Sequence, residues 1–183
     1  EKVECVIHSL RMSLTNEDRI IILQDRDGER FLPIWVKRGD LESILVALEH
    51  TLMARPMTHD LIMSLFNTLE AELLYIEIDD LRDDIYFAKL HLKAQGVEHI
   101  VDSRPSDAIA LALRARVPSF VSKNILEEVA IRPEDAMVLE NEETGPLPDG
   151  DLSPFADFLD TLNSDKGAAD SKADDSPMPP EEP

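Results

Sequence analysis

The sequence lacks the features of a disulfide-stabilised or membrane-embedded protein. Its 183 residues include a single cysteine, Cys5, which excludes an internal disulfide framework and a cysteine-rich zinc site. No apolar run approaches the ~18 residues needed to cross a bilayer, and no signal-peptide pattern opens the sequence. We therefore expect a cytoplasmic protein with no membrane partner.

Basic side chains are also scarce. The chain has 18 Lys and Arg against 38 Asp and Glu, which gives a formal net charge of −20. No basic run is longer than Lys37-Arg38, whereas tight nucleic-acid binding draws on clustered Lys and Arg to neutralise phosphates. The composition therefore argues against tight, non-specific nucleic-acid binding, and any nucleic-acid partner is expected to bind weakly and non-specifically. It leaves open weak binding in which a divalent metal offsets the repulsion.

The charge is unevenly distributed along the chain. Most of the excess acidic charge and most of the 12 prolines fall between residues 133 and 183. We predict a domain over 1–132 and a disordered, acidic, Pro-rich tail over 133–183. Residues 152–162 of the tail form a short amphipathic helical patch, too short to be stable alone. This patch has three candidate partners: the domain, a second subunit or another protein.

Hydrophobic periodicity in the first 132 residues predicts an α+β fold, a mixed, largely antiparallel sheet packed against several helices. An antiparallel meander is expected first, with Trp35 as a buried anchor at its end. A helix over 39–53 follows, and the next one begins near Thr58 as N-cap. The expected buried stripe of that second helix is Leu61, Ile62, Leu65, Phe66 and Leu69. Further strands are predicted at 72–78, 85–92, 97–101 and 117–121, with a last short helix at 122–129.

The stretch Asp102–Arg114, which reads DSRPSDAIALALR, organises the rest of the domain. Its second half is apolar on all sides, as in a helix buried inside a domain. Its first half is a polar helix entrance. Pro105 suits the first turn, Ser103 or Ser106 can cap it, and Asp107 lies where the helix dipole favours an anion. We therefore expect a buried helix whose polar start opens at the edge of the core.

This stretch resembles the signature of the bifunctional nuclease family, small bacterial and plant domains described as having both DNase and RNase activity. LPIW at Leu32–Trp35 and RPMTHDL at Arg55–Leu61 are similar to the family pattern in the same order. The resemblance covers roughly residues 3–131. It implies hydrolysis of phosphodiester bonds in DNA or RNA and a homodimer. The chain departs from the pattern after LPIW, where Glu42 is the candidate for the family's acidic position.

Two helix entrances share one design, and together they give the candidate site. In each, Arg-Pro precedes a helix whose first turn carries a hydroxyl and a carboxylate, an arrangement suited to a phosphate. If the entrances converge, we expect four catalytic residues: His59, Asp60, Asp102 and Asp107. Phosphate binding is assigned to Arg55, Arg104 and Ser106. Asp102 and Asp107 are the candidate ligands for Mg²⁺ or Mn²⁺, and no organic cofactor is implied.

The same residues fit a structural role equally well. First-turn Ser, Thr and Asp are ordinary caps, and Arg–Asp pairs brace neighbouring helices. His59 is the most informative of them, because a cap needs no imidazole and histidine titrates near neutral pH. The alternative to a nuclease is therefore a non-catalytic binding or regulatory module that uses the same polar pocket for an anionic ligand or a protein partner.

Overall fold

The computed structural model describes residues 1–13, 19–132 and 144–146, all of which belong to one compact unit, Glu1–Pro148. The amphipathic patch predicted at 152–162 lies outside the described residues. The described ranges contain eight strands: β1 (Lys2–Ser13), β2 (Arg19–Asp25), β3 (Phe31–Val36), β4 (Ala71–Arg82), β5 (Ile85–Ala94), β6 (Val97–Ser103), β7 (Ser119–Ser122) and β8 (Thr144–Pro146). The four helices of this part of the chain are α1 (Arg38–Leu48), α2 (Thr58–Thr68), α3 (Pro105–Ala115) and α4 (Lys123–Val129).

All strands of the described residues join one sheet in the order β3-β2-β1-β7-β4-β5-β6, with β8 paired to β1 beside this path. Every pairing is antiparallel except the one between β4 and β7. The predicted α+β fold with a mixed, largely antiparallel sheet is therefore confirmed. Residues 144–146, which the sequence places in the tail, pair with the end of β1.

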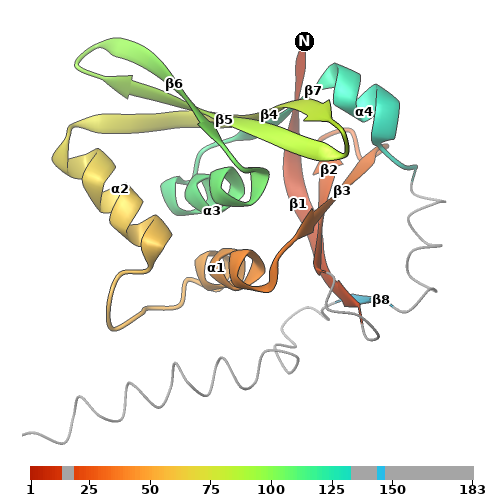
Figure 1. The fold of residues 1–183 in the computed structure, drawn as a ribbon, viewed down its shortest axis with the longest axis horizontal. Helices are drawn as coiled ribbons and strands as arrows, with labels where there is room; N and C mark the ends of the chain where they lie inside the picture. Colours follow the sequence, from red (N-terminus) through yellow and green to blue (C-terminus); the bar gives the residue numbers. More distant parts are fainter. Residues whose placement is uncertain (14–18, 133–143, 147–183) are drawn as a thin grey trace, which may run out of the picture. The chain divides into compact units, whose positions relative to one another are not determined.

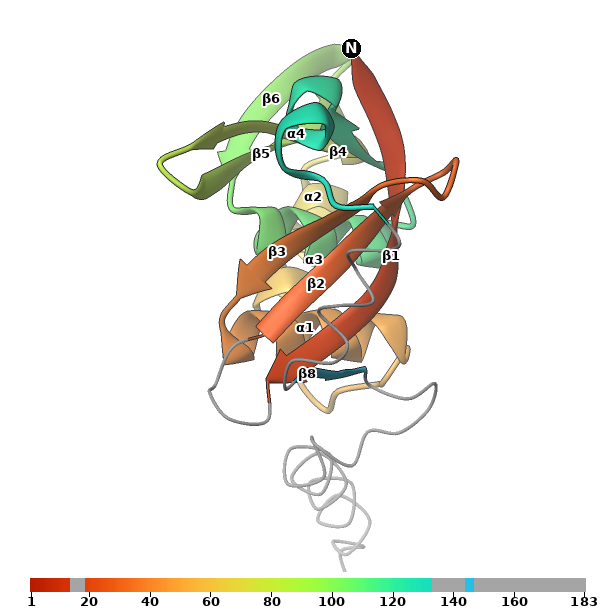
Figure 2. The ribbon, with the colours of Figure 1, turned by 90° about the vertical axis from the view of Figure 1, so that its right-hand side faces the viewer.

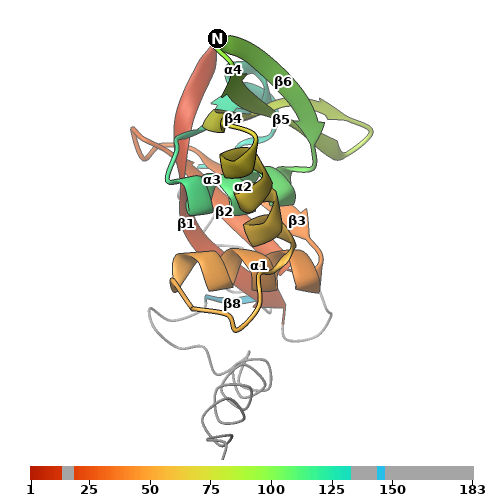
Figure 3. The same cartoon turned by 90° about the vertical axis from the view of Figure 1, so that its left-hand side faces the viewer.

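The sheet is bent, so that β1–β3 and β4–β6 run in different directions (Figure 1). Helices α1, α2 and α3 lie on one side of it, and α4 lies apart from them next to β7, as Figures 2 and 3 also show. The β4–β5 hairpin turns at Asp83 and Asp84, and the β5–β6 hairpin turns at Gln95 and Gly96. All four residues have positive φ, as a two-residue type I′ hairpin turn requires.

The core lies between the helices and the sheet. Ile109 and Leu111 of α3 are at most 2% exposed, as are Leu41 of α1 and Ile76 of β4. Ala108 of α3 is also fully buried, and its small side chain allows the helix to approach its neighbours closely. The predicted burial of this helix is confirmed for residues 108–112, and Leu113 is half-buried. None of the helices in the described part of the chain is long and apolar enough to cross a membrane.

Three local predictions are wrong. Trp35 is 59% exposed, because it lies near the end of the edge strand β3. The first helix ends at Leu48 rather than at Met53, and Leu52 beyond it is 82% exposed. The expected N-cap Thr58 is already the first helical residue, and Met57 is the N-cap.

The apolar stripe predicted for the second helix is also wrong in orientation. His59 is the buried residue of α2, and the half-buried Ile62 and Phe66 share its inward side. Leu61, Leu65 and Leu69 are 54%, 50% and 67% exposed. Apolar side chains therefore occupy two sides of α2. The sequence pattern alone does not show which of the two sides is buried.

Candidate functional site

Helices α1, α2 and α3 each carry an aspartate in the first turn: Asp40, Asp60 and Asp107. The positive end of a helix dipole stabilises a carboxylate there by about 0.3–1 kcal/mol. The contacts described below connect these three helix starts to one another. The two entrances that the sequence singles out therefore converge, and the start of α1 joins them.

Arg104 links the starts of α1 and α3. As the residue before Pro105, it has the extended backbone that proline imposes on its predecessor, and it is the N-cap of α3. Its Nε donates to Oδ2 of Asp107 at 2.7 Å, while Nη1 and Nη2 donate to the carboxylate of Asp40 at 3.1 and 3.0 Å. The Arg104 side chain is nonetheless 57% exposed. It is therefore a solvent-accessible cation held between two carboxylates.

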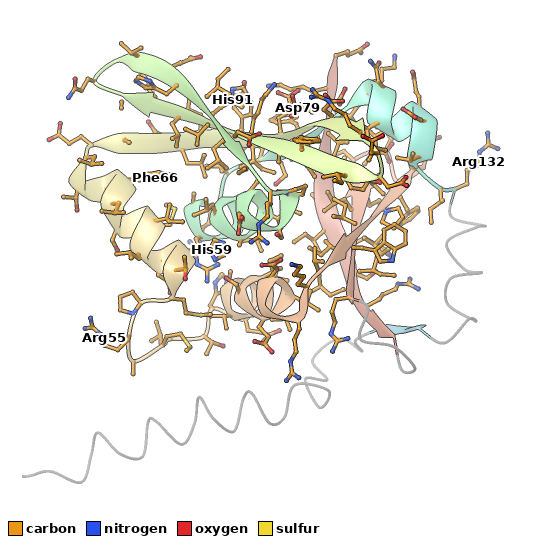
Figure 4. The ribbon with its side chains drawn as sticks, in the orientation of Figure 1. Arg55, His59, Phe66, Asp79, His91 and Arg132 are labelled. Atoms are coloured by element: carbon orange, nitrogen blue, oxygen red, sulfur yellow. The ribbon has the colours of Figure 1, made fainter. Side chains whose placement is uncertain are left out.

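The side chain of His59, on α2, contacts both α1 and α3 (Figure 4). Its Nε2 is 3.1 Å from Oδ1 of Asp107, and its Nδ1 is 2.7 Å from Oγ of Ser43 on α1. A neutral imidazole satisfies both contacts when the Ser43 hydroxyl donates to Nδ1 and the Nε2–H donates to Asp107. Both His59 and Ser43 are buried. The imidazole is thus fixed from both sides.

Asp60, the carboxylate at the start of α2, is paired with a different arginine. Arg114, in the last turn of α3, donates from Nε to Oδ1 of Asp60 at 2.6 Å. The other oxygen accepts the Met57 N–H at 2.9 Å. Nη1 of Arg114 also donates to the Ser43 carbonyl at 3.1 Å, so both entrances are tied to the same residue of α1.

These contacts set the charge states of the two carboxylates. Burial alone would raise the pKa of Asp107, but the hydrogen bonds from Arg104 and His59 outweigh it, and the pKa lies below its usual value. Burial opposes ionisation of Asp60 as well, and the bonds from Arg114 and the Met57 N–H again bring the pKa below the usual value. Both groups are therefore ionised at neutral pH.

The structure brings together four of the seven predicted site residues: His59, Asp60, Arg104 and Asp107. Ser106 neighbours them on α3 but is only 5% exposed. Asp102 is exposed on β6 opposite Lys89 and makes no contact with this network among the described residues. Arg55 is exposed in the connection between α1 and α2 and lies away from His59 in Figure 4.

A sequence profile of the family described as Bifunctional nuclease domain matches residues 21–134. The chain belongs to this family. The match contains all four helices and every site residue discussed above. It also confirms the resemblance that the three sequence motifs predict.

Individual relatives support the same assignment. An uncharacterized protein of Mycobacterium tuberculosis is 28% identical over 162 residues, which cover 88% of this chain and 96% of that protein. Bifunctional nuclease 2 of Oryza sativa subsp. japonica is 31% identical over 116 residues, 61% of this chain and 36% of the plant protein. Bifunctional nuclease 1 of Arabidopsis thaliana is 30% identical over 107 residues, 56% of this chain and 33% of its own length. The chain thus matches about a third of each of these plant proteins.

Sequence reasoning missed three members of the network: Asp40, Ser43 and Arg114. Asp40 shares the first-turn position of the other two aspartates, which is a signal that the sequence does contain. Glu42, the expected acidic residue of that segment, instead pairs with Arg38 at 2.9 Å. Arg114 closes the central signature but lies two turns from its polar start, so only the fold reveals its contact with α2.

The described residues include no group of three or more His, Cys, Asp or Glu side chains placed to hold a metal ion. Asp107 accepts hydrogen bonds from Arg104 and His59. Asp102 and Asp107 as ligands of Mg²⁺ or Mn²⁺ stay a prediction.

Proposed function

We propose that this chain is a nuclease that hydrolyses phosphodiester bonds in DNA or RNA where α1, α2 and α3 begin. Family membership supports the nuclease class. The observation that carries the proposal is the pairing of a 57% exposed Arg104 with Asp107, which is itself bonded to the buried His59. This arrangement combines an accessible cation that can bind a phosphate with a carboxylate–imidazole pair that can accept a proton.

In the proposed reaction, Arg104 exchanges one of its carboxylate partners for the phosphodiester, whose two oxygens suit its forked donors. Asp107 is 29% exposed and ionised, so it can accept the proton of a water that attacks the phosphorus. The P–O bond to the leaving oxygen breaks as the new P–O bond forms, and solvent water protonates the leaving oxygen. The Nε2–H of His59 holds Asp107 in place and stabilises its charge. Asp60 acts at a distance, because it positions Arg114 and, through the Ser43 carbonyl, the α1 side of the site.

The remaining assignments stay predictions. Arg55 and Ser106 as phosphate ligands and Asp102 as a catalytic residue have no support from contacts in one copy of the chain. A dependence on Mg²⁺ or Mn²⁺ is likewise a proposal, and no step above is routed through a metal. The net charge of −20 gives a reason to test this dependence, because a divalent cation would reduce the repulsion between the acidic chain and the phosphates.

The test is cleavage of single- and double-stranded DNA and RNA by highly purified full-length protein, with Mg²⁺, Mn²⁺ or EDTA. We expect Asp107→Asn to reduce the rate about 100-fold or more, the usual size of a general acid–base contribution. His59→Gln removes the hydrogen bond that holds Asp107 and should reduce the rate by a smaller factor. Glu42→Gln is the matched control, because Glu42 lies on α1 outside the network and pairs only with Arg38 among the described contacts. Undiminished cleavage by both site variants would refute the assignment.

One observation favours the alternative, a non-catalytic binding module. The chain has a net charge of −20, which repels the phosphates of a nucleic-acid substrate. A complete lack of cleavage under every metal condition, with folded protein, would select this alternative. Binding of an anionic ligand or a protein partner at Arg104 would then be the function.

We also propose that the protein is a homodimer, with the exposed leucines of α2 in the interface. Leu61, Leu65 and Leu69 recur at helical spacing and are each at least half exposed. A contiguous apolar surface of this kind commonly marks an interface, and a two-fold axis buries the same surface of both copies. Light scattering should therefore give the mass of a dimer for the full chain and of a monomer for Leu65→Glu. A monomeric wild type would contradict the proposal.

A further inference from the structure

Trp35 is the one tryptophan of the chain, and more than half of its side chain is exposed. It lies on the edge strand β3, where Ile20 of β2 is its register partner. Indole rings carry a large apolar surface and are favoured where proteins bind ligands or partners. The exposure of Trp35 therefore requires an explanation that the fold alone does not supply.

A hollow of about 390 Å³ lies beside Trp35. This volume is within the usual range of small-molecule sites, about 300–1,000 Å³. Ile85, itself 60% exposed, lines it together with the ring of Tyr86. Arg104 and Ser106 also line it, as does Asp40, so the hollow adjoins the network described above.

The two sides of this hollow come from distant parts of the chain. The bend of the sheet brings the start of β5 to β3, where the Tyr86 hydroxyl is 3.5 Å from the Pro33 carbonyl. A second hollow of about 510 Å³ shares Trp35, Asp84 and Tyr86 with the first. The indole therefore lines two neighbouring spaces, one of which reaches Arg104.

The charges around the first hollow balance. Lys37 and Arg104 are opposed by Asp40 and Asp84, and the guanidinium of Arg104 is paired with the Asp40 carboxylate. Because these charges balance, the hollow offers an anionic ligand little net electrostatic attraction. A flat neutral ring, in contrast, can stack on an aromatic side chain and contact the apolar walls. The chemistry therefore favours a neutral aromatic group whose attached phosphate lies near Arg104.

We infer that the hollow between Trp35 and Arg104 binds an unpaired nucleobase next to the phosphodiester held at Arg104. This inference rests on the proposed nuclease function and deepens it. Bases within a duplex are already stacked on their neighbours, so their faces are not accessible to an indole ring. The substrate class is therefore single-stranded nucleic acid, and the second hollow leaves room for an adjoining nucleotide.

Fluorescence of Trp35 provides a direct test, because no other tryptophan contributes emission. Full-length protein in EDTA at low salt is titrated with a single-stranded oligothymidylate, and separately with a blunt duplex of equal length. We expect saturable quenching by the single strand and at least about tenfold weaker binding of the duplex. EDTA separates this binding from any metal-dependent cleavage.

Anisotropy of a labelled oligothymidylate then compares three variants. Loss of one stacked base weakens binding by about 5- to 150-fold, so Trp35→Leu should lose affinity to this extent while Trp35→Phe keeps most of it. Ile100→Ala is the control, because Ile100 is a 61% exposed apolar residue of β6 that lines neither hollow. Circular dichroism establishes that each variant is folded.

The outcomes separate the inference from the nuclease proposal. Cleavage with no Trp35 quenching, and with unchanged KM for Trp35→Leu, would overturn the base site and leave the nuclease. Quenching with no cleavage under any metal condition would support the base site and remove the nuclease. An emission change that follows protein concentration without oligonucleotide would show that a second copy covers Trp35, which would also overturn the inference.

Discussion

The starts of α2 and α3 share a sequence design but not a structure. At α3, Arg104 is the N-cap itself, and its guanidinium turns back onto the first-turn Asp107. At α2, two residues, Pro56 and Met57, separate Arg55 from the first helical residue, and Arg55 is exposed in the preceding segment. The first-turn Asp60 then takes its cation from Arg114.

The difference shows that the spacing between arginine and helix decides what the arginine does. An arginine at the N-cap can reach a carboxylate in the same first turn, three residues further on. An arginine placed before the N-cap, such as Arg55, does not pair with the first-turn carboxylate, and an arginine of another helix supplies the positive charge. The two cations also differ in burial, because the Arg104 side chain is 57% exposed and that of Arg114 is 9% exposed. The α3 entrance is therefore accessible to a ligand, whereas the Asp60–Arg114 pair joins the start of α2 to the last turn of α3.

Removing the cation of the α2 entrance should have the largest effect on stability. Arg114→Met leaves Asp60 without its ion pair and also removes the donors to the Ser43 carbonyl. We expect the free energy of unfolding to fall by about 2 kcal/mol, less than for a fully buried pair because Asp60 is partly exposed. Urea denaturation of the two proteins measures the difference.

Arg55→Met is the matched control for this prediction. In the sequence, Arg55-Pro56 precedes α2 as Arg104-Pro105 precedes α3. In the structure, Arg55 is exposed. Its replacement should change the free energy of unfolding by no more than about 0.5 kcal/mol, as at other exposed sites. Equal losses in Arg55→Met and Arg114→Met would contradict the prediction, because the Asp60–Arg114 pair would then stabilise the fold no more than an exposed arginine does.

Much of the fold follows from local pattern. The 108–113 run has no polar face, so burial of α3 is predictable, and strand alternation places β4, β5 and β6 correctly. Orientation is harder to predict. Helix α2 is apolar on two sides, and only the tertiary structure shows that His59 and Phe66 face inward while Leu65 faces outward. The exposure of Trp35 likewise results from its place on an edge strand of the sheet, which the local sequence pattern does not reveal.

The candidate site was accessible to sequence reasoning only where partners are close in the chain. The Arg104–Asp107 pair lies within one helix turn and could be read from the motif. The contacts of His59 with Ser43 and Asp107 span 16 and 48 residues, and that of Asp60 with Arg114 spans 54. Such contacts depend on helix packing, for which the sequence offers no local signal.

A smaller effect is expected from pH at the α3 entrance. The folded-state pKa of Asp107 is lowered, so its contribution to stability is present above its unfolded pKa of about 3.9 and is lost as pH falls through the folded value. Asp107→Asn should therefore cost about 1 kcal/mol at pH 7, given the exposure of Arg104, and progressively less below about pH 4. Urea unfolding between pH 3 and pH 7 measures this difference. A cost that persists unchanged at pH 3 would mean that Asp107 stabilises the fold through packing and not through its charge.

The smallest effect is expected at the cap of α2, where the two entrances also differ. Thr58 looks like an N-cap in the sequence, but it is exposed and already helical, and Asp60 instead accepts the N–H of the N-cap residue Met57. Thr58→Ala should therefore change the free energy of unfolding by less than about 0.5 kcal/mol, whereas loss of a true capping side chain costs about 1 kcal/mol. Thermal unfolding of Thr58→Ala beside Asp60→Ala tests this, with the larger loss expected for Asp60→Ala. A loss of about 1 kcal/mol in Thr58→Ala would instead place the cap one residue later, as the sequence pattern suggests.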